Sequence, residues 1–334
     1  MPTGMKTMRA VEARGFHVPP SLLRASPSIW PNGRGTICMG MGTVTGLSLE
    51  AFLPELPEVE ITRRHLEEAM VGRRLESVRV THTRTARYNA TTGEVESRLS
   101  GRRVDTVGRH GKFLVIGLDD GYTMVAHMGM SGRFSVAAKS DAAKSDEGAP
   151  HTHFVAVLDD GAEVRFIDPR TFGFIAVFDE DELSDSALSR LGPDAWVDPP
   201  SVPILMRALN GRTAPIKALL LDQGPIAGLG NIYADEALHL AGIHPLTPGG
   251  GLDATEVAGL LLAIQKVLSE AIESGGTTLD DLAYLLPDGQ AGDNLSRLGV
   301  YARTDEPCLK CGTPVERIVV RARSTHFCPR CQAL

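Results

Sequence analysis

The 334-residue sequence is poor in aromatic side chains and has no long apolar run. Aromatic residues make up 5% of the chain against 43% hydrophobic residues in all, so the core must be mainly aliphatic. No run of about 18 apolar residues occurs, which excludes a membrane-spanning helix. The charged fraction of 22% is ordinary for a globular protein and excludes a mostly disordered or collagen-like chain. The net charge of −7 argues against a surface coated with basic residues, but it is compatible with a local basic groove.

Cysteine is also scarce, and its spacing is informative. Four of the five cysteines form two CxxC pairs near the C-terminus, Cys308 with Cys311 and Cys328 with Cys331. This pattern is typical of a zinc ribbon, in which four thiolates fill the tetrahedron and leave no position for water, so we expect one structural zinc ion. Reduced structural thiols or a redox CxxC pair are the alternatives. The tail that holds the pairs is locally basic, as expected for a module that faces phosphates.

The first 53 residues lack a sustained hydrophobic period and lack an apolar segment after their basic residues, so we expect no secretory signal. We expect residues 1–53 to be disordered or absent from the natural product. Leu53 directly precedes Pro54, and an alternative bacterial start codon encodes leucine when it is read internally. Initiation at position 53, followed by removal of the methionine, is therefore our interpretation, with proteolytic cleavage after Leu53 as a second route.

From Pro54 onward the patterns indicate three units. Residues 54–190 predict a leading helix followed by antiparallel strands, because two Asp-Gly turns each separate a pair of apolar runs. Residues 191–297 follow a proline-rich boundary and carry helical periods. Residues 298–334 hold the cysteine pairs. The expected fold class is therefore α+β.

A glycine-rich turn, GPIAGLGN, joins two predicted helices and ends at Asn231. Glycines let the backbone approach a phosphate, and the start of the second helix offers unpaired N–H groups to an anion. Arg212 and Lys217, which precede the turn, strengthen this interpretation. A tight helix–helix turn without a ligand is the alternative.

Six segments then occur in a specific order along the chain. They are PELPEVE at 54–60, GKFL at 111–114, HMGMSG at 127–132, DPRTFG at 168–173, IKALLLDQ with GLGNIYADEAL at 216–238, and RSTHFCPRC at 323–331. Together they resemble the formamidopyrimidine-DNA glycosylase family, with its endonuclease-VIII-like relatives, from Pro54 to the C-terminus. The resemblance implies an antiparallel β-sandwich with a leading helix, a helix–two-turn–helix domain and a C-terminal zinc-ribbon finger, with DNA held between two lobes. PELPE rather than PEGPE favours the formamidopyrimidine branch.

The resemblance implies a bifunctional DNA glycosylase/AP lyase of base excision repair. Its substrates would be oxidised purines, 8-oxoguanine and formamidopyrimidines, processed by Schiff-base chemistry with β,δ-elimination. The implied catalytic residues are Pro54 as the N-terminal amine, Glu55 as the acid on the sugar, Lys112 in β-elimination and Arg323 on phosphate in δ-elimination. An α-amino group with a pKa of about 8 is partly neutral at physiological pH, whereas a lysine near about 10.4 is mostly protonated.

The resemblance also implies how the duplex is held. A flipped-out base leaves a gap that must be filled, and the implied void-filling residues are Met130, Arg170 and Phe172. The implied phosphate contacts are His151, Arg212, Lys217 and Asn231. The expected partner is double-stranded damaged DNA, bound by a monomer in the cytoplasm of a bacterial-type cell, with no membrane contact.

Two departures from the family pattern leave alternatives open. Pro54 is not the first residue here, and a mid-chain proline nitrogen is an amide that cannot form a Schiff base. If the leader stays attached, a non-catalytic binder of damaged DNA is the alternative. In addition, residues 289–298 read GQAGDNLSRL, without the aromatic residue of the family's lesion-capping turn. An endonuclease-VIII-like preference for oxidised pyrimidines or abasic sites is therefore the alternative within the enzyme class.

Overall fold

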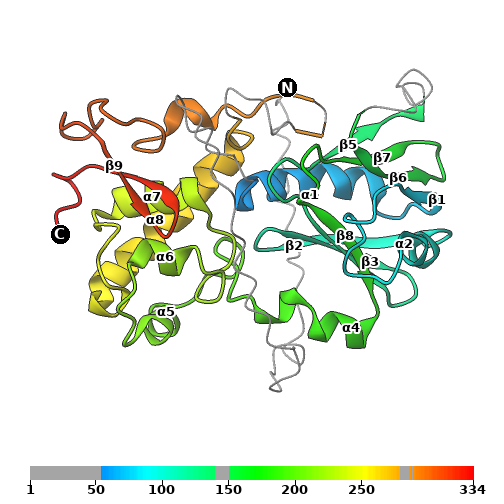
Figure 1. Ribbon diagram of the computed structural model, residues 1–334, viewed down its shortest axis with the longest axis horizontal. Coiled ribbons are helices and arrows are strands. Elements are labelled where there is room, and N and C mark those ends of the chain that lie inside the picture. The colour runs from blue at the N-terminus through cyan, green and yellow to red at the C-terminus, as the bar shows by residue number, and fades with distance from the viewer. Residues whose placement is uncertain (1–53, 140–149, 279–285, 288) are drawn as a thin grey trace, which may run out of the picture.

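The computed structural model describes residues 54–139, 150–278, 286–287 and 289–334. It has two lobes side by side, with helix α1 (Leu56–Met70) at their junction and the C-terminal hairpin against the helical lobe (Figure 1). The α+β class is thus confirmed. The leader, residues 1–53, lies outside the described residues. Among the described residues, no helix combines the length and the apolar character needed to cross a bilayer.

The first lobe is an antiparallel β-sandwich. One four-stranded sheet has the order β1-β6-β7-β5 and the other β2-β3-β4-β8. The two sheets enclose an aliphatic core to which Phe134, Phe154 and Phe166 add the buried rings. Both hairpins predicted at the Asp-Gly turns are confirmed, since these turns join β3 to β4 and β6 to β7. The strands are β1 (Leu75–Val80), β2 (Val104–His110), β3 (Phe113–Leu118), β4 (Thr123–His127), β5 (Arg133–Ala137), β6 (Thr152–Leu158), β7 (Glu163–Ile167) and β8 (Phe174–Phe178).

Short helices at the edge of the sandwich add to the predicted pattern. They are α2 (Thr92–Leu99), α4 (Glu180–Asp185) and the 3-10 helix η2 (Ala187–Arg190). Helix α2 buries only Val95 and Leu99, so its amphipathic period is too short to stand out in the sequence.

The second lobe is helical, as its periodicity predicts. Its core is almost wholly aliphatic and includes Leu56, which belongs to the first turn of α1. The remainder of the buried face of α1, from Val59 to Met70, packs into the sandwich core instead. Helix α1 is therefore shared by both lobes. The helices are α5 (Val202–Leu209), α6 (Ile216–Leu220), α7 (Asn231–Ala241) and α8 (Ala254–Glu273), with the 3-10 helices η3 (Gly249–Gly251) and η4 (Asn294–Arg297).

The C-terminal finger is a two-stranded antiparallel hairpin of β9 (Glu316–Val320) and β10 (Arg323–Phe327). Strand β10 packs against α7. The hairpin turn is tight, because Arg321 and Ala322 both adopt positive φ angles, 45° and 61°. This turn presents Arg323 at the start of β10.

A buried ion pair joins the sandwich to the interlobe linker, which we define as residues 191–201. Arg109 of β2 donates to both carboxylate oxygens of Asp194, at 2.6 and 3.2 Å, and both side chains are 1% exposed. Arg109 also donates to Glu60 of α1 at 3.2 Å. Asp194 accepts the backbone N–H of Gly111 at 2.8 Å, next to Lys112. Burial acts to raise the pKa of Asp194, but the Arg109 charge and the N–H donors bring it below the usual value.

Replacing Asp194 with alanine should leave the buried Arg109 guanidinium with Glu60 as its remaining carboxylate partner and two of its donors without their Asp194 acceptors. Breaking a buried pair from one side costs about 3 kcal/mol or more of unfolding free energy. The matched control is Asp105→Ala, since Asp105 pairs with Arg103 at 3.1 Å while both are half exposed. That exposed pair should contribute less than about 1 kcal/mol. Urea unfolding of both variants measures the difference, and equal losses would refute the assignment of the Arg109–Asp194 pair as a structural joint.

Candidate functional site

The centre of the site is the buried carboxylate of Glu55, which precedes α1 and meets the start of α7. Its two oxygens accept backbone N–H groups from Gly230, Ile232 and Tyr233 at 2.9, 3.0 and 3.4 Å. The start of a helix favours an anion because its first N–H groups are unpaired and its dipole is positive there. A Cβ at Gly230 would collide with the Glu55 carboxyl group, so glycine is required at this position.

This geometry corrects the interpretation of the glycine-rich turn. The predicted occupant of the α7 N-terminus is a phosphate, but the carboxylate of Glu55 already takes those N–H groups. The glycines admit another part of the same chain. Gly228 has a φ of 112° and lies under Leu56, whose Cδ1 would collide with an added Cβ. The side chains of Leu56 and Glu55 thus leave no room for a Cβ at positions 228 and 230 of the turn.

Lys112 lies within electrostatic range of both Glu55 and Arg323. Burial raises the pKa of Glu55 above its usual value, and the nearby Lys112 charge partly opposes this. Burial lowers the pKa of Lys112; Glu55 and Glu58 oppose that shift, and Arg323 adds to it. Pro54 is buried and adjacent to Glu55 in the chain. The structure therefore gathers the residues that the sequence predicts to be catalytic.

Lys217 has a different environment from the one predicted. Its side chain is 0% exposed and its ammonium pairs with Asp235 of α7 at 2.6 Å. The ammonium also donates to the backbone oxygen of Ser324 at 2.6 Å, and Asp235 accepts the N–H of His326 at 2.9 Å. A lysine enclosed in this way cannot reach a phosphate in solvent. Lys217, which belongs to α6, therefore holds β10 against α7 through Asp235 and Ser324, the residue next to Arg323.

The residues predicted to fill a void lie on two adjoining loops. Met130 and Phe172 are half-buried, and the exposed Arg170 guanidinium lies 5.2 Å from the Phe172 ring centroid. Asp168 holds the loops together because it accepts the Ser131 hydroxyl and the Gly173 N–H, both at 2.7 Å. Met130, Arg170 and Phe172 thus project from two loops that are hydrogen-bonded to each other, and we call these three residues the platform.

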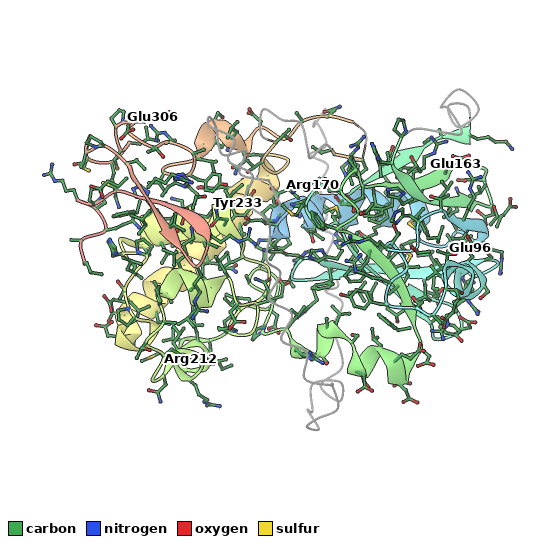
Figure 2. All side chains as sticks on the ribbon, in the orientation of Figure 1. Glu96, Glu163, Arg170, Arg212, Tyr233 and Glu306 are labelled. Carbon is green, nitrogen blue, oxygen red and sulfur yellow. The ribbon has the colours of Figure 1, made fainter. Side chains whose placement is uncertain are left out.

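The remaining predicted DNA contacts are not all in one place. His151 is exposed beside the platform, since its carbonyl accepts the Asp168 N–H at 2.9 Å. Asn231 begins α7 and donates to the Ser324 hydroxyl at 3.3 Å; its Oδ1 is buried and meets no donor within the described part of the chain. Arg212 is exposed on the outer side of the helical lobe, away from Arg170 and Tyr233 at the lobe junction (Figure 2).

One functional-looking residue lacks an assignment from the sequence although it lies in a quoted segment. His127 of β4 pairs in register with Phe113 and Phe174. Burial, with the charges of Lys112 and Arg87, lowers the pKa of His127 to about 4. The neutral ring accepts the Gly129 N–H at 3.0 Å and so holds the loop that carries Met130. Its position directly before that loop is the signal that could have identified it.

The two CxxC pairs form one compact cluster. The four sulfur atoms all lie within 4.8 Å of one another, and all four thiols are free. Cross-pair separations are 4.0 Å for Cys308 to Cys331 and 3.4 Å for Cys311 to Cys328. Zn–S bonds of about 2.3 Å in a tetrahedron require sulfur separations of about 3.8 Å. The donor set and its dimensions therefore fit zinc, and the mixing of sulfurs from both pairs favours a four-ligand site over a separate redox pair.

Comparisons with known proteins agree with this geometry. Three family models match in succession: the formamidopyrimidine-DNA glycosylase N-terminal domain at residues 53–175, its H2TH domain at 191–282, and the zinc finger found in FPG and IleRS at 305–334. The formamidopyrimidine-DNA glycosylase of Herpetosiphon aurantiacus is 42% identical over 287 residues, which cover 84% of this chain and 100% of that protein. The Thermus thermophilus protein of the same name is 44% identical over 281 residues, covering 84% of this chain and 98% of the relative.

Solved structures give the same result. The crystal structure of the MutM (Fpg) protein from Thermus thermophilus matches with a TM-score of 0.73 and 43% identity, over 84% of this chain and 98% of that one. A complex between the Lactococcus lactis Fpg and DNA containing an abasic site matches with a TM-score of 0.75 and 30% identity, over 84% of this chain and 100% of that one. With its three domains matched in order and the Glu55 site between them, the chain belongs to the formamidopyrimidine-DNA glycosylase family.

Proposed function

We propose that the chain removes oxidised purines, 8-oxoguanine and formamidopyrimidines, from duplex DNA and then cleaves the strand as an AP lyase. Membership of the family makes it a DNA glycosylase of base excision repair. The observation that carries the proposal is the buried Glu55, held by the α7 N-terminus beside Pro54 and within the field of Lys112. A related Fpg was solved with DNA containing Fapy-dG, which supports the substrate class.

The nucleophile of this reaction is the secondary amine of Pro54. Its nitrogen attacks C1′ of the damaged nucleotide, the C1′–base bond breaks, and the base leaves with its bonding electrons and a proton. The sugar ring opens as O4′ takes a proton, which leaves a positively charged iminium bond (the Schiff base) between the Pro54 nitrogen and C1′. Loss of a C2′ proton then expels the 3′ phosphate, and a second elimination expels the 5′ phosphate.

The shifted acid–base properties of the site suit these proton transfers. Because burial raises the pKa of Glu55, this carboxyl holds a proton more readily than an exposed glutamate and can deliver it to O4′. Because burial lowers the pKa of Lys112, its amine is more readily neutral and can accept a proton during β-elimination. The Arg323 guanidinium would hold the phosphates that leave.

The Met130–Arg170–Phe172 platform fills the gap that base flipping leaves in the duplex. The apolar side chains replace lost stacking, and the exposed guanidinium offers donors to the unpaired opposite base. His151, Asn231 and Arg212 are proposed phosphate contacts; Lys217 is not, because it is enclosed. We expect a monomer that acts on cellular DNA in the cytoplasm.

The finger is proposed to hold one structural zinc ion through Cys308, Cys311, Cys328 and Cys331. When bound, the ion supplies folding energy to a segment whose own buried apolar cluster is small, and it plays no chemical part in catalysis. Its consequence for the site is the placement of Arg323, which begins β10 of the finger.

The state of the Pro54 nitrogen decides whether this chemistry can occur. Residues 1–53 acylate that nitrogen, so we propose that the active form begins at Pro54. Borohydride should trap a covalent complex of the Pro54-initiated chain with abasic or 8-oxoguanine DNA, and β,δ-elimination ends should form. The chain from Met1 should bind the same DNA without being trapped. A denaturing gel of both chain lengths measures this.

Two controls sharpen the test. Pro54→Gly in the short chain keeps an N-terminal amine but changes it from secondary to primary, so trapping should fall. Glu55→Gln keeps the shape of the side chain but replaces one acceptor oxygen with an NH₂ group and removes the acid, so it should slow base excision. Efficient trapping of the intact long chain would contradict the assignment of Pro54. Preference for an oxidised pyrimidine over 8-oxoguanine would instead select the endonuclease-VIII-like alternative.

Metal content gives an independent test. Elemental analysis should find about one zinc per chain, because four thiolates hold one tetrahedral ion. Cys331→Ser should lose the metal and weaken DNA binding together, whereas Cys38→Ser in the full chain should retain both. Full DNA affinity after complete removal of zinc would show that the finger does not depend on the ion.

A further inference from the structure

Behind the site, four buried polar side chains form a continuous hydrogen-bonded row. The Asn294 amide nitrogen donates to the Thr277 hydroxyl at 2.9 Å, that hydroxyl contacts the Tyr233 hydroxyl at 2.9 Å, and Tyr233 donates to Glu58 Oε1 at 2.6 Å. Glu58, Tyr233 and Thr277 are 0% exposed and Asn294 is 4% exposed. None of the four is among the residues assigned to catalysis or DNA contact above.

The direction of this row follows from its two ends. An amide NH₂ can only donate, and an ionised carboxylate can only accept. Each hydroxyl between them has one proton, so Thr277 donates to Tyr233 and Tyr233 donates to Glu58. With Glu58 ionised, the row is therefore satisfied in this one orientation. A buried polar group without its hydrogen bond destabilises the folded protein, so the protonation state of Glu58 affects every residue of the row.

The row connects two distant segments. At one end, residues 274–277 are fastened to residues 293–294: Asp293 N–H donates to Ser274 O at 2.9 Å and Asn294 N–H to Gly276 O at 3.1 Å. At the other end, Glu58 Oε2 accepts the Glu55 N–H at 2.8 Å, and Oε1 also accepts the Thr277 N–H at 2.9 Å. The Glu55 N–H belongs to the peptide that links Pro54 to Glu55.

Protonation of Glu58 would weaken this connection, because it removes the negative charge from a carboxylate that accepts three hydrogen bonds, from the Glu55 N–H, the Tyr233 hydroxyl and the Thr277 N–H. Burial raises the pKa of Glu58 to about 7, with the Tyr233 and Thr277 hydrogen bonds opposing the shift and the Glu55 charge adding to it. The charged or titratable groups that act on this position are Glu55, Tyr233 and, from the turn after β2, Lys112. The row therefore changes its protonation state within the physiological range.

We propose that Glu58 and Tyr233 are positioning residues for the Pro54 reaction: the ionised Glu58, kept in place by the Tyr233–Thr277–Asn294 row, fixes the Pro54–Glu55 peptide for attack on the sugar. This rests on the proposed function, since it assumes the Pro54 amine as nucleophile. Neither side chain reaches solvent, so their effect falls on the rate of attack and not on DNA affinity.

The experiment measures single-turnover iminium formation on preformed abasic DNA from pH 5.5 to 8.5, in the chain form that traps in the test above. The relatives consist of that portion alone, which this chain covers over 98–100% of their length. The wild-type rate should rise with pH through about 7 as Glu58 ionises, ahead of the further rise that deprotonation of the Pro54 amine gives near about 8. Tyr233→Phe removes one hydroxyl that lowers this pKa, so the midpoint should move to higher pH. At pH 7 the rate should fall about tenfold, as for a modest misplacement of reacting groups, with DNA affinity changed less than about twofold.

A matched pair tests the next link of the row. Thr277→Val has nearly the same shape but lacks the hydroxyl and should reproduce the Tyr233→Phe shift, whereas Thr277→Ser keeps the hydroxyl and should restore the wild-type profile. Tyr122→Phe is the control for the tyrosine change, since Tyr122 stacks under Arg102 at 4.7 Å in the sandwich, remote from the site.

Three results separate the possibilities. An unchanged midpoint and rate in Tyr233→Phe and Thr277→Val would overturn the inference while wild-type trapping leaves the proposed function intact. A rate lowered equally at every pH together with a lower melting temperature would also overturn it, since that is the signature of a merely structural role. Failure of the wild-type chain to trap at all would remove the proposed function and this inference with it.

Discussion

The whole arrangement depends on one carboxylate that caps a helix belonging to the other lobe. Glu55 lies 175 residues before Gly230, yet it takes the N–H groups that open α7. This contact is favourable because the carboxyl oxygens accept the otherwise unpaired N–H groups at the positive end of the helix dipole. It also forces glycine at position 230, brings Leu56 into the helical core, and sets the position of Pro54. The order of α1, the glycine turn and α7 in space follows from this one interaction.

Around that contact, the protein uses buried charge pairs as joints between its units. Arg109 and Asp194 fasten the linker to the sandwich near Lys112, and Lys217 with Asp235 fastens the finger to α7 near Arg323. Each pair is therefore hydrogen-bonded to the residue next to a side chain proposed to act on DNA, Gly111 beside Lys112 and Ser324 beside Arg323. Removing one partner from a buried ion pair lowers the free energy of unfolding far more than removing one from an exposed pair, so each of these pairs contributes strongly to how the units are held together.

Short sequence patterns were sufficient to predict structure that forms within a short segment. Asp-Gly turns identified both hairpins, and the CxxC spacing identified the four-sulfur cluster, because each pattern is complete within a short segment. Contacts between distant residues were beyond that reasoning. The sequence around Lys217 does not indicate that Asp235 is its partner. The sequence of the glycine turn is equally compatible with a bound phosphate and with the carboxylate of Glu55. The motif resemblance placed Pro54, Glu55, Lys112 and Arg323 together, but it did not reveal the Glu58–Tyr233–Thr277–Asn294 row.

Because α1 has its first turn in one core and its remaining turns in the other, the lobes do not constitute independent folding units. A movement of one lobe away from the other would bend this helix near its start or pull Glu55 out of the α7 N-terminus. Such a movement would therefore take the acid away from the N–H groups that hold it.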